Sequence, residues 1–433
     1  MFETSMAALH EAKAALAEAP SDLSDAQLVD LIREAEELKC SAAAAQAAAA
    51  VRLDESQRAA QVEAGVRPAR VGEGIAEQVG LARRESAAKG ARLLGLAKVL
   101  EHEMPHTRAL MRDGRLNEWR ATILVRETAC LSLADRRTVD ERLCAGGEAA
   151  TMSDLALTRA AKKLACELDP ASVAERARRA ESERHVSIRP APDTMCWVTA
   201  LLPVKQAVNI YAVLLAMAAT ARAQGDERSK GQVMADTLVE RVTGRPAEEA
   251  PRVEIKLVMT DASLFGQTDD AAHVEGYGPV PAPWARAFVV GAMCATRAWI
   301  RRLYVAPTTG QLVAMDSRAR CAPAGLADFV ATRDQGICRI PWCGAPIRQT
   351  DHVTAWADGG KTTGANTQGL CERHNLAKEA LGWSAIAILD PDGTHTVETT
   401  TPTGHRHRSR APAPPGADRV STSSGPPGLE LTA

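Results

Sequence analysis

Four side chains near the C-terminus have the types and spacing of a metal site. Cys338 and Cys343 are separated by four residues, and a Cys371-x2-His374 pair follows after a loop. Three thiolates and one imidazole form a common tetrahedral zinc set. In the second pair, positions i and i+3 of a helix present both donors on the same side. Because two such pairs in one short segment rarely coincide by chance, the sequence predicts a structural zinc site rather than a few buried cysteines beside an unrelated histidine.

Between and beside these pairs lies a second set of polar residues. In chain order it consists of Asp351, His352, a Gly-Gly turn, Asn366, Asn375 and Lys378. This stretch, over about residues 333–383, resembles the HNH endonuclease family, whose fold is a β-hairpin and a helix around a catalytic metal. The whole chain also resembles a large actinobacterial family in which an HNH module follows a long, mostly helical domain of unknown function, number 222 in its series. That second resemblance is carried by GYGPVPAPWAR, MDSRAR, RDQGICRIPWC and the pair Gly382-Trp383.

The resemblance implies a role for each residue of the second set. His352 would be the general base that takes a proton from the attacking water. Asp351 and Asn375 would hold one catalytic divalent ion, Mg²⁺ or Mn²⁺. Asn366 would bond within the loop and help to orient His352, and Lys378 would contact a phosphate. The implied reaction is the metal-dependent hydrolysis of phosphodiester bonds in double-stranded DNA.

The chemistry and the local geometry agree with most of these roles. A hard divalent ion neutralises the charge that builds on the phosphate, and a neutral imidazole is a suitable base near pH 7. His374 and Asn375 differ by about 100° around a helix axis, so one can face zinc while its neighbour faces the active site. Lys378 lies on the same side as Asn375. Adjacent Asp351 and His352 would point to opposite faces of a regular strand, so both can serve one site only where the strand bends or ends.

One position departs from the family pattern. Many relatives carry His-His where this chain has His374-Asn375. Asparagine supplies a neutral oxygen ligand, which favours Mg²⁺ or Mn²⁺ over softer ions. An alternative function follows, in which the protein keeps the zinc and binds nucleic acid without catalysing cleavage.

A second alternative is a transcriptional regulator with a helix-turn-helix. In GIAEQVGLARRESAAKGARLL, Gly80 would lie in the turn, and Arg83 and Arg84 would open a recognition helix. Alanine-rich helical hairpins often have the same spacing, so this pattern is weak evidence.

Composition places these motifs in a globular protein without a strong charge. The 433 residues include 52 Lys+Arg and 54 Asp+Glu, with 45% hydrophobic and 3% aromatic residues. This balance excludes a disordered chain and a bulk polycation. Nucleic-acid binding would then need a local basic patch, the N-terminal domain or a homodimer. With no secretory signal and no long apolar run, we expect a cytoplasmic protein with no membrane segment, where cysteines stay reduced and clustered ones bind metal.

The pattern along the chain predicts an α+β protein. A helical domain is expected over residues 1–185, with mixed α/β structure continuing over 186–325. The helical domain should contain a long helix that begins at Ser24 or Asp25 and a helix interrupted at Pro170. Hairpins are expected after it, at HVSIRPAPDTMCWVTALLP and RLYVAPTTGQLVAMD. A zinc-stapled ββα-metal (HNH) module is expected over 326–386.

The last segment, residues 402–433, is rich in Pro, Ser and Gly and is expected to be disordered. Its basic side chains could contact phosphate, although a solubilising tail is the simpler interpretation. These side chains are His405, Arg406, His407, Arg408 and Arg410.

Overall fold

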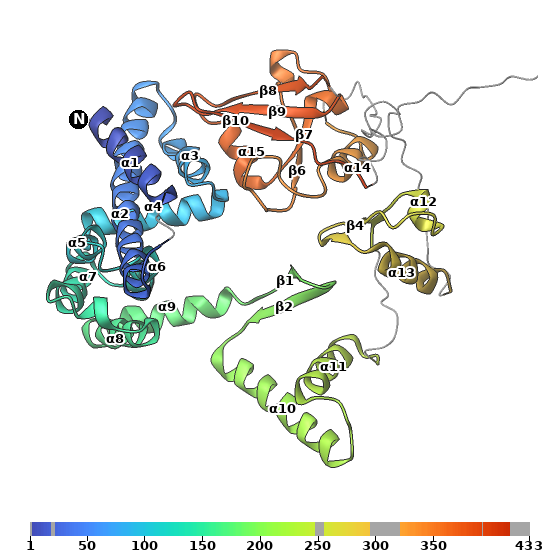
Figure 1. The fold of residues 1–433 in the computed structure, drawn as a ribbon, viewed down its shortest axis with the longest axis horizontal. Helices are drawn as coiled ribbons and strands as arrows, with labels where there is room; N and C mark the ends of the chain where they lie inside the picture. Colours follow the sequence, from blue (N-terminus) through green and yellow to red (C-terminus); the bar gives the residue numbers. More distant parts are fainter. Residues whose placement is uncertain (1, 19–21, 247–254, 295–320, 392, 416–433) are drawn as a thin grey trace, which may run out of the picture. The chain divides into compact units, whose positions relative to one another are not determined.

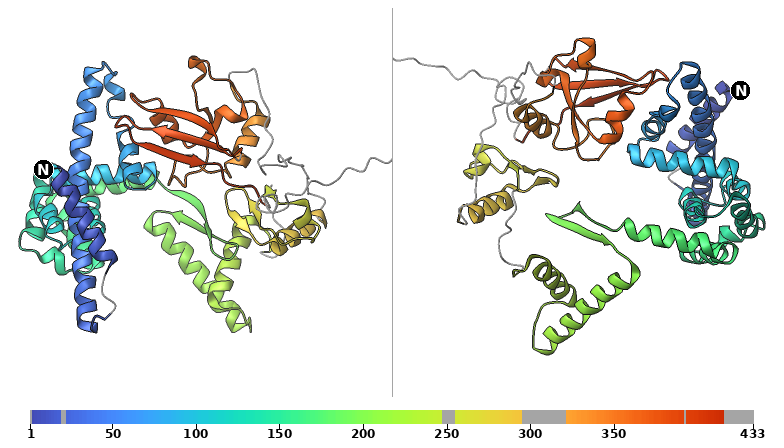
Figure 2. Two further views of the ribbon diagram at one scale, coloured as in Figure 1. Left: turned by 45° about the horizontal axis from the view of Figure 1, so that its top comes forward. Right: turned by 180° about the vertical axis from the view of Figure 1, so that it is seen from behind.

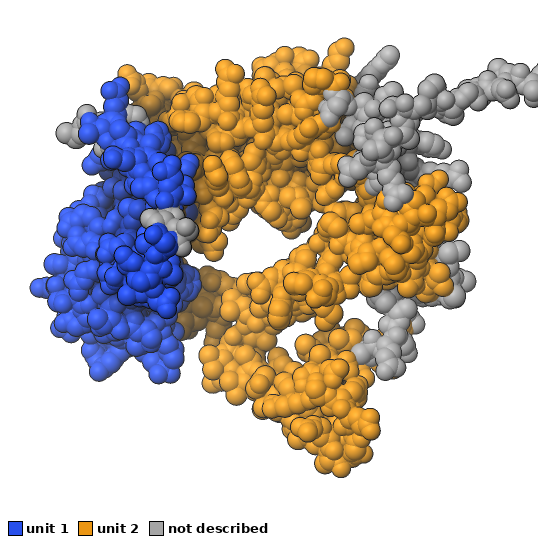
Figure 3. Space-filling view, in the orientation of Figure 1, with its two compact units in different colours: residues 1–56, 93–174 blue, residues 57–92, 175–433 orange. Residues whose placement is uncertain are grey.

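The protein consists mainly of helices, with several small antiparallel sheets (Figure 1). The residues described by the computed structural model are 2–18, 22–246, 255–294, 321–391 and 393–415. They divide into two compact units, coloured separately in Figure 3: residues 1–56 with 93–174 (unit 1), and 57–92 with 175–433 (unit 2). The helix-dominated, mixed architecture agrees with the coarse α+β prediction. The hairpin expected at RLYVAPTTGQLVAMD lies outside the described residues.

Unit 1 is helical. Its elements, three of which continue into unit 2, are α1 (Phe2–Ala17), α2 (Asp25–Glu63), α4 (Ala87–His102), α5 (Pro105–Arg112), α6 (Glu118–Glu127), α7 (Leu133–Asp140), η2 (Glu141–Ala145), η3 (Glu148–Thr151), α8 (Asp154–Leu168) and α9 (Pro170–Ser182). The Ser24 hydroxyl accepts the Gln27 N–H at 3.4 Å and caps α2, as the sequence predicts. Pro170 separates α8 from α9, again as predicted. Fully buried Leu100, Met104 and Leu124 belong to the core that holds these helices together.

The first half of unit 2 contains two small sheets and several helices. Its elements are η1 (Pro68–Arg70), α3 (Ile75–Ala82), β1 (His185–Ala191), β2 (Met195–Leu201), α10 (Val204–Ala223), α11 (Lys230–Thr243), β3 (Leu257–Val258), α12 (Asp261–Leu264), β4 (Ala272–Val274), β5 (Gly278–Val280) and α13 (Ala282–Cys294). The predicted hairpin β1–β2 turns at Asp193 and Thr194, which both have positive φ. A second core lies around β4, β5 and α13.

One helix among the described residues, α10, is long and apolar enough to cross a membrane by length and composition alone. A single helix of this kind is weak evidence for a membrane span, because helices of soluble proteins pass the same test.

The second half of unit 2 carries the candidate site. Its elements are α14 (Ala324–Arg333), β6 (Gln349–His352), η4 (Trp356–Asp358), η5 (Gly364–Asn366), β7 (Thr367–Leu370), α15 (Glu372–Lys378), β8 (Ser384–Leu389), β9 (His395–Thr400) and β10 (Arg406–Arg410). Strands β6 and β7 pair antiparallel, with Asp351 opposite Gln368, and α15 follows directly. Strands β8, β9 and β10 lie side by side in a second antiparallel sheet (Figure 2).

The segment expected to be a disordered tail therefore contains an ordered strand. Residues 406–410 pair with residues 396–400 in antiparallel register, and the Ala411 N–H donates to His395 O at 2.8 Å. Composition alone predicted disorder here, but pairing with β9 supplies hydrogen bonds that local sequence does not show. Residues 416–433 lie outside the described part of the chain.

Candidate metal centre

The four predicted zinc ligands come from two short elements that the fold brings together. Cys338 and Cys343 lie on a tight turn after α14, in which Cys343 N–H donates to Ile340 O at 3.1 Å and Trp342 adopts φ 62°. Cys371 is the N-cap residue directly before α15, and His374 lies in the first turn of that helix. The structure therefore confirms the grouping that the paired spacings predicted.

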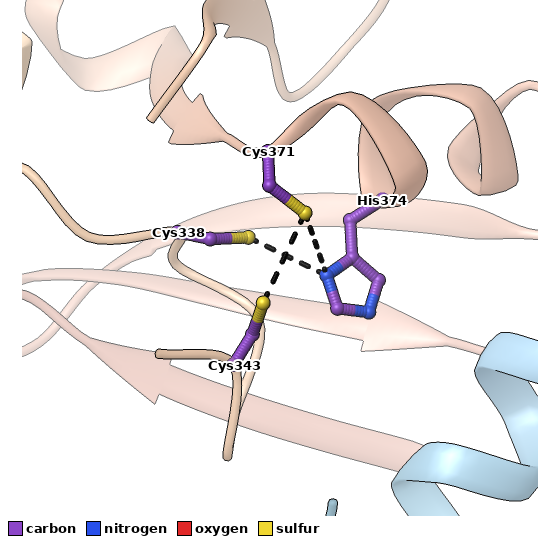
Figure 4. A group of neighbouring side chains, drawn as sticks. All are labelled: Cys338, Cys343, Cys371 and His374. Atoms are coloured by element: carbon purple, nitrogen blue, oxygen red, sulfur yellow. Dashed lines mark hydrogen bonds between the residues drawn. The ribbon is translucent and has the colours of Figure 1, made fainter. Parts of the chain in front are cut away.

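The ligand atoms converge on one point (Figure 4). All four lie within 4.8 Å of one another. Cys343 Sγ is 3.9 Å from Cys371 Sγ, and His374 Nδ1 is 3.4 Å from Cys338 Sγ and 3.5 Å from Cys371 Sγ. A tetrahedral zinc ion with bonds of about 2.3 Å to sulfur and about 2.0 Å to nitrogen separates two sulfurs by roughly 3.8 Å and sulfur from nitrogen by roughly 3.5 Å. The donor set and its spacing fit zinc.

The site is buried, and its four side chains shift one another's pKa values. Each of the four residues is at most 7% exposed. Hydrogen bonds among the thiols raise the pKa of Cys338 and lower the pKa of Cys371. Burial lowers the pKa of His374, but the sulfurs of Cys343 and Cys371 outweigh burial and raise it to about 9. Zinc binding would therefore require the Cys338 thiol and the His374 ring to lose their protons, because thiolates and a neutral imidazole are the ligands of the ion.

The wall of the centre includes a helix from far away in the sequence. Leu81 of α3 packs with Ile340, Leu370 and the three cysteines in one buried cluster, and Trp383 packs against it. Buried Glu77, also on α3, lies near the ring of His374, and burial raises the pKa of its carboxyl. No local pattern connects α3 with the cysteines, so sequence reasoning missed this contribution.

The second set of predicted residues surrounds the β6–β7 hairpin and α15. Asp351 is the second-to-last residue of β6, and its carboxylate accepts hydrogen bonds from Lys378 Nζ at 2.7 and 2.9 Å. Lys378 also donates to His352 O, and Gln368 Nε2 donates to Asp351 Oδ2 at 3.3 Å. The end of β6 is therefore joined to the end of α15 through a partly buried ion pair.

His352 is the last residue of β6, and its side chain contacts the loop that follows. Its Nε2 lies 2.9 Å from Thr362 Oγ1, and its ring meets the Trp356 indole edge to face at 6.1 Å. The strand ends here, which is the condition under which neighbouring Asp351 and His352 can serve one site. Thr362 is fully buried, and nothing in the sequence singled it out as a partner of His352.

Asn366 bonds within the loop between β6 and β7, as its predicted role requires. Its Oδ1 accepts the Thr354 N–H at 2.9 Å, while its Nδ2 donates to Thr354 O at 3.1 Å and to Lys361 O at 2.9 Å. These bonds hold both sides of the loop together directly after His352. A side chain on Gly360 would lie 1.9 Å from Thr354 O, so the Gly-Gly turn is required for this closure.

Asn375 follows His374 on α15 and is partly buried. Its position one helical turn before Lys378 places it on the helix face that approaches Asp351. The structure thus joins Asp351 and Lys378 by direct contact, and it places Asn375 on the adjoining turn. His352 and Asn366 belong to the neighbouring loop.

A buried charge network, which the sequence did not reveal, supports this hairpin. Asp334 accepts from Arg333 at 2.7 Å, from Arg339 at 2.9 Å and from Gly369 N–H at 2.8 Å. Arg333 also donates to the carbonyls of Gly364 and Thr367, which flank Asn366. Burial would raise the pKa of Asp334, but the two guanidinium groups lower it overall. The RDQGICR segment carries this network, so its charged residues are structural.

The helix-turn-helix candidate corresponds to α3 and α4, with a turn over residues 83–86. The two helices cross closely, because a Cβ on Gly90 would lie 2.7 Å from Gly80 N. Arg83 is the C-cap residue directly after α3, and Arg84 adopts φ 56° in the turn. Neither arginine opens α4, which begins at Ala87, so the expected placement of these side chains on a recognition helix is corrected.

Fold and site together define a helix-dominated protein with a buried Cys₃His cluster that could hold a metal ion such as zinc. The chain matches the family described as Domain of unknown function (DUF222) over residues 32–334, and it belongs to that family. The match ends at Asp334, before the first cysteine of the metal centre. No curated protein and no solved structure matches the chain.

Proposed function

We propose that this protein is a metal-dependent DNA endonuclease of the HNH type. The observation that carries the proposal is the order and position of the polar residues: Asp351 and His352 at the end of β6, and Asn375 and Lys378 on α15. Two antiparallel strands followed by a helix, next to a zinc-type cluster, support the proposed ββα-metal module. Asn366, in the loop between the strands, completes the set.

The proposed catalytic ion would bind to oxygen ligands from Asp351 and Asn375. In this structure the Asp351 carboxylate accepts hydrogen bonds from Lys378 on both of its oxygens, so binding of the ion would require Lys378 to turn away toward the phosphate that it is proposed to contact. Mg²⁺ or Mn²⁺ bound there would neutralise the scissile phosphate. His352 would take the proton of the attacking water, with Thr362 and Trp356 holding its ring in orientation. Asn366 would fix the loop that carries His352.

The substrate that we propose is double-stranded DNA, encountered in the cytoplasm, where reduced thiols can retain zinc. A homodimer would double the number of DNA contacts. The rival function is a zinc-containing nucleic-acid-binding protein that does not cleave, because Asn375 replaces the histidine that many relatives carry. A regulator acting through α3 and α4 is less well supported, because Arg83 and Arg84 lie outside α4.

A plasmid-nicking assay with added Mg²⁺ or Mn²⁺ tests the proposal. Wild type should convert supercoiled DNA to the open form, and His352→Ala should not, while keeping its zinc and its helical content. His185→Ala is the matched control, because His185 is an exposed histidine at the start of β1, outside the proposed site, and this variant should cut like wild type. If His352→Ala cuts as fast as wild type, the nicking arises elsewhere and the enzymatic proposal fails in favour of the binding protein.

A further inference from the structure

The edge strand β10 presents a row of arginines on one face of its sheet. Arg406, Arg408 and Arg410 alternate with His407 and Ser409, so the three arginines share a face. Their side chains are 71%, 70% and 55% exposed. The other face turns toward the protein: Ser409 Oγ accepts from Arg339, and the His407 ring meets Trp342 edge to face. The row of Arg406, Arg408 and Arg410 is called the arginine ladder below.

Carboxylates beneath the arginine ladder hold it in an extended arrangement. Buried Glu398 of β9 accepts from Arg408 at 2.7 Å and lies 3.5 Å from Arg406. Arg410 donates to Thr394 Oγ1 at 3.0 Å and lies 3.6 Å from Asp390. Three guanidinium groups thus face two carboxylates, which leaves a net positive charge. Each guanidinium has five N–H donors, and all three side chains remain more than half exposed to solvent.

The arginine ladder is connected to the candidate active site through buried hydrogen bonds. Arg339 donates to Ser409 O at 2.6 Å and to His395 O at 3.2 Å. His395 Nε2 in turn lies 3.0 Å from Ala365 O, the carbonyl directly before Asn366. The sheet and the loop after His352 therefore form one packed body, and a ligand on the ladder would have a defined position relative to that loop.

We propose that the arginine ladder is a docking surface for the phosphate backbone of duplex DNA, the substrate of the proposed nuclease. The inference rests on that proposed function and adds the surface that binds the substrate. Charge complementarity supports it, because arginine is the side chain best suited to bidentate phosphate contacts. Alternate residues of a strand are spaced by roughly 6.8 Å, so the row can follow several consecutive phosphates. The ladder supplies the local basic patch that a chain of neutral composition needs.

A competing explanation is that the arginines only guard an exposed edge strand against pairing with a second copy of the chain, as charged residues often do. The two explanations make opposite predictions. Edge protection predicts self-association when the charges are removed, with no change in DNA binding. Docking predicts weaker and less salt-dependent DNA binding by a chain whose state of association is unchanged.

The experiment measures binding of a labelled duplex oligonucleotide by the full chain in the His352→Ala background, so that no cleavage interferes. The test variant carries Arg406→Gln, Arg408→Gln and Arg410→Gln. The control carries Arg33→Gln, Arg112→Gln and Arg178→Gln, which removes three similarly exposed, ion-paired arginines from helices α2, α5 and α9. A third variant replaces the ladder arginines by lysine. Zinc content and gel-filtration volume are recorded for each protein.

The ladder variant should bind at least tenfold more weakly than the His352→Ala parent. Its plot of log affinity against log salt should be less steep by about 2 to 3, since each lost phosphate contact reduces the slope by about 0.9. The control should keep the parent slope within about one contact, and the lysine variant should recover most of it. An unchanged slope in the ladder variant overturns the docking surface, whatever its association state.

These outcomes separate the docking surface from the nuclease proposal. Plasmid nicking by wild type together with unchanged binding by the ladder variant would refute only the docking surface. Normal ladder-dependent binding without nicking by wild type would support the surface and favour the non-catalytic binding protein. Absence of duplex binding by the parent would contradict both.

Discussion

Gly74 and Trp383 are in close contact although more than three hundred positions separate them in the chain. Gly74 adopts φ +82°, and a Cβ added to it would lie 2.5 Å from Trp383 Nε1. Gly74 belongs to the segment that matches the DUF222 family, whereas Trp383 lies beyond the match. Leu81 extends the same contact into the wall of the metal centre. The family domain therefore supplies part of the core of the C-terminal module.

Gly74→Ala should lower the free energy of unfolding by about 1–3 kcal/mol, because the positive φ strains a side chain and the Trp383 ring must move. Urea unfolding followed by tryptophan fluorescence measures the effect. Gly95→Ala is the matched control, since Gly95 lies within α4 with nothing near its added Cβ, and alanine there should be neutral or stabilising. Equal effects of the two substitutions would contradict the close contact.

Zinc content tests the metal centre. The purified protein should contain about one tightly bound zinc per chain, because four protein ligands close the tetrahedral shell. Cys371→Ser should lose this zinc and loosen the surrounding core, since metal binding and folding are coupled. Cys166→Ser, which changes an exposed cysteine outside the cluster, should keep it. Elemental analysis of freshly purified, unchelated protein decides the question, and a zinc-free wild type would refute the site.

Substitution of the proposed catalytic ligands should separate them from zinc binding. Asp351→Ala should abolish nicking yet retain zinc, because Asp351 is not part of the Cys₃His cluster. Asn375→Ala should cut poorly and recover in part at high Mg²⁺ or Mn²⁺, as expected when a weak site loses one ligand. Asn375→His should retain or raise activity and extend it to softer ions, which imidazole suits. Nicking rate as a function of metal concentration measures all three.

That prediction has a clear negative outcome. If Asn375→Ala and wild type show the same dependence on metal concentration, Asn375 is not a ligand of the catalytic ion. Loss of zinc from Asp351→Ala would show instead that the two sites are not independent.

His395 should make stability depend on pH. Burial first, and then the charges of Arg333 and Arg339, lower the pKa of His395 to about 4. Arg339 Nη1 lies 3.5 Å from His395 Nδ1 and can donate only to an unprotonated ring nitrogen, which favours the neutral ring, whereas the bond between Nε2 and Ala365 O opposes this shift. In the unfolded chain its pKa is about 6.5, so the unfolded state takes up the proton first as pH falls. The stability is complete above about pH 6.5 and is lost progressively toward about pH 4.

The matching measurement compares urea unfolding of wild type and His395→Gln at about pH 7 and about pH 5, with zinc present throughout. Wild type should lose roughly 2 kcal/mol more than the variant over this interval. Acid effects on the metal ligands are common to both proteins and cancel in the difference. Parallel losses would show that His395 is not held neutral.

The sequence by itself determined the features that depend on near neighbours. The zinc-type ligands could be recognised because each pair lies within one turn of chain, so spacing alone sets the direction of its donors. The cap at Ser24 and the break at Pro170 follow from single residues acting on the adjacent backbone. The bonding of Asn366 within its loop was expected only from the resemblance to the HNH family, since its partner Thr354 is twelve residues away.

Only the tertiary structure decided the features that join distant segments. The packing of Leu81 and Gly74 on the metal-bearing module, the Asp334 charge network and the pairing of Lys378 with Asp351 all depend on contacts between separate elements. The order of β10 is the clearest case, because its composition favours disorder and β9 supplies the missing hydrogen bonds. Local sequence fixes which groups a segment offers, whereas burial and long-range pairing fix which of those groups meet.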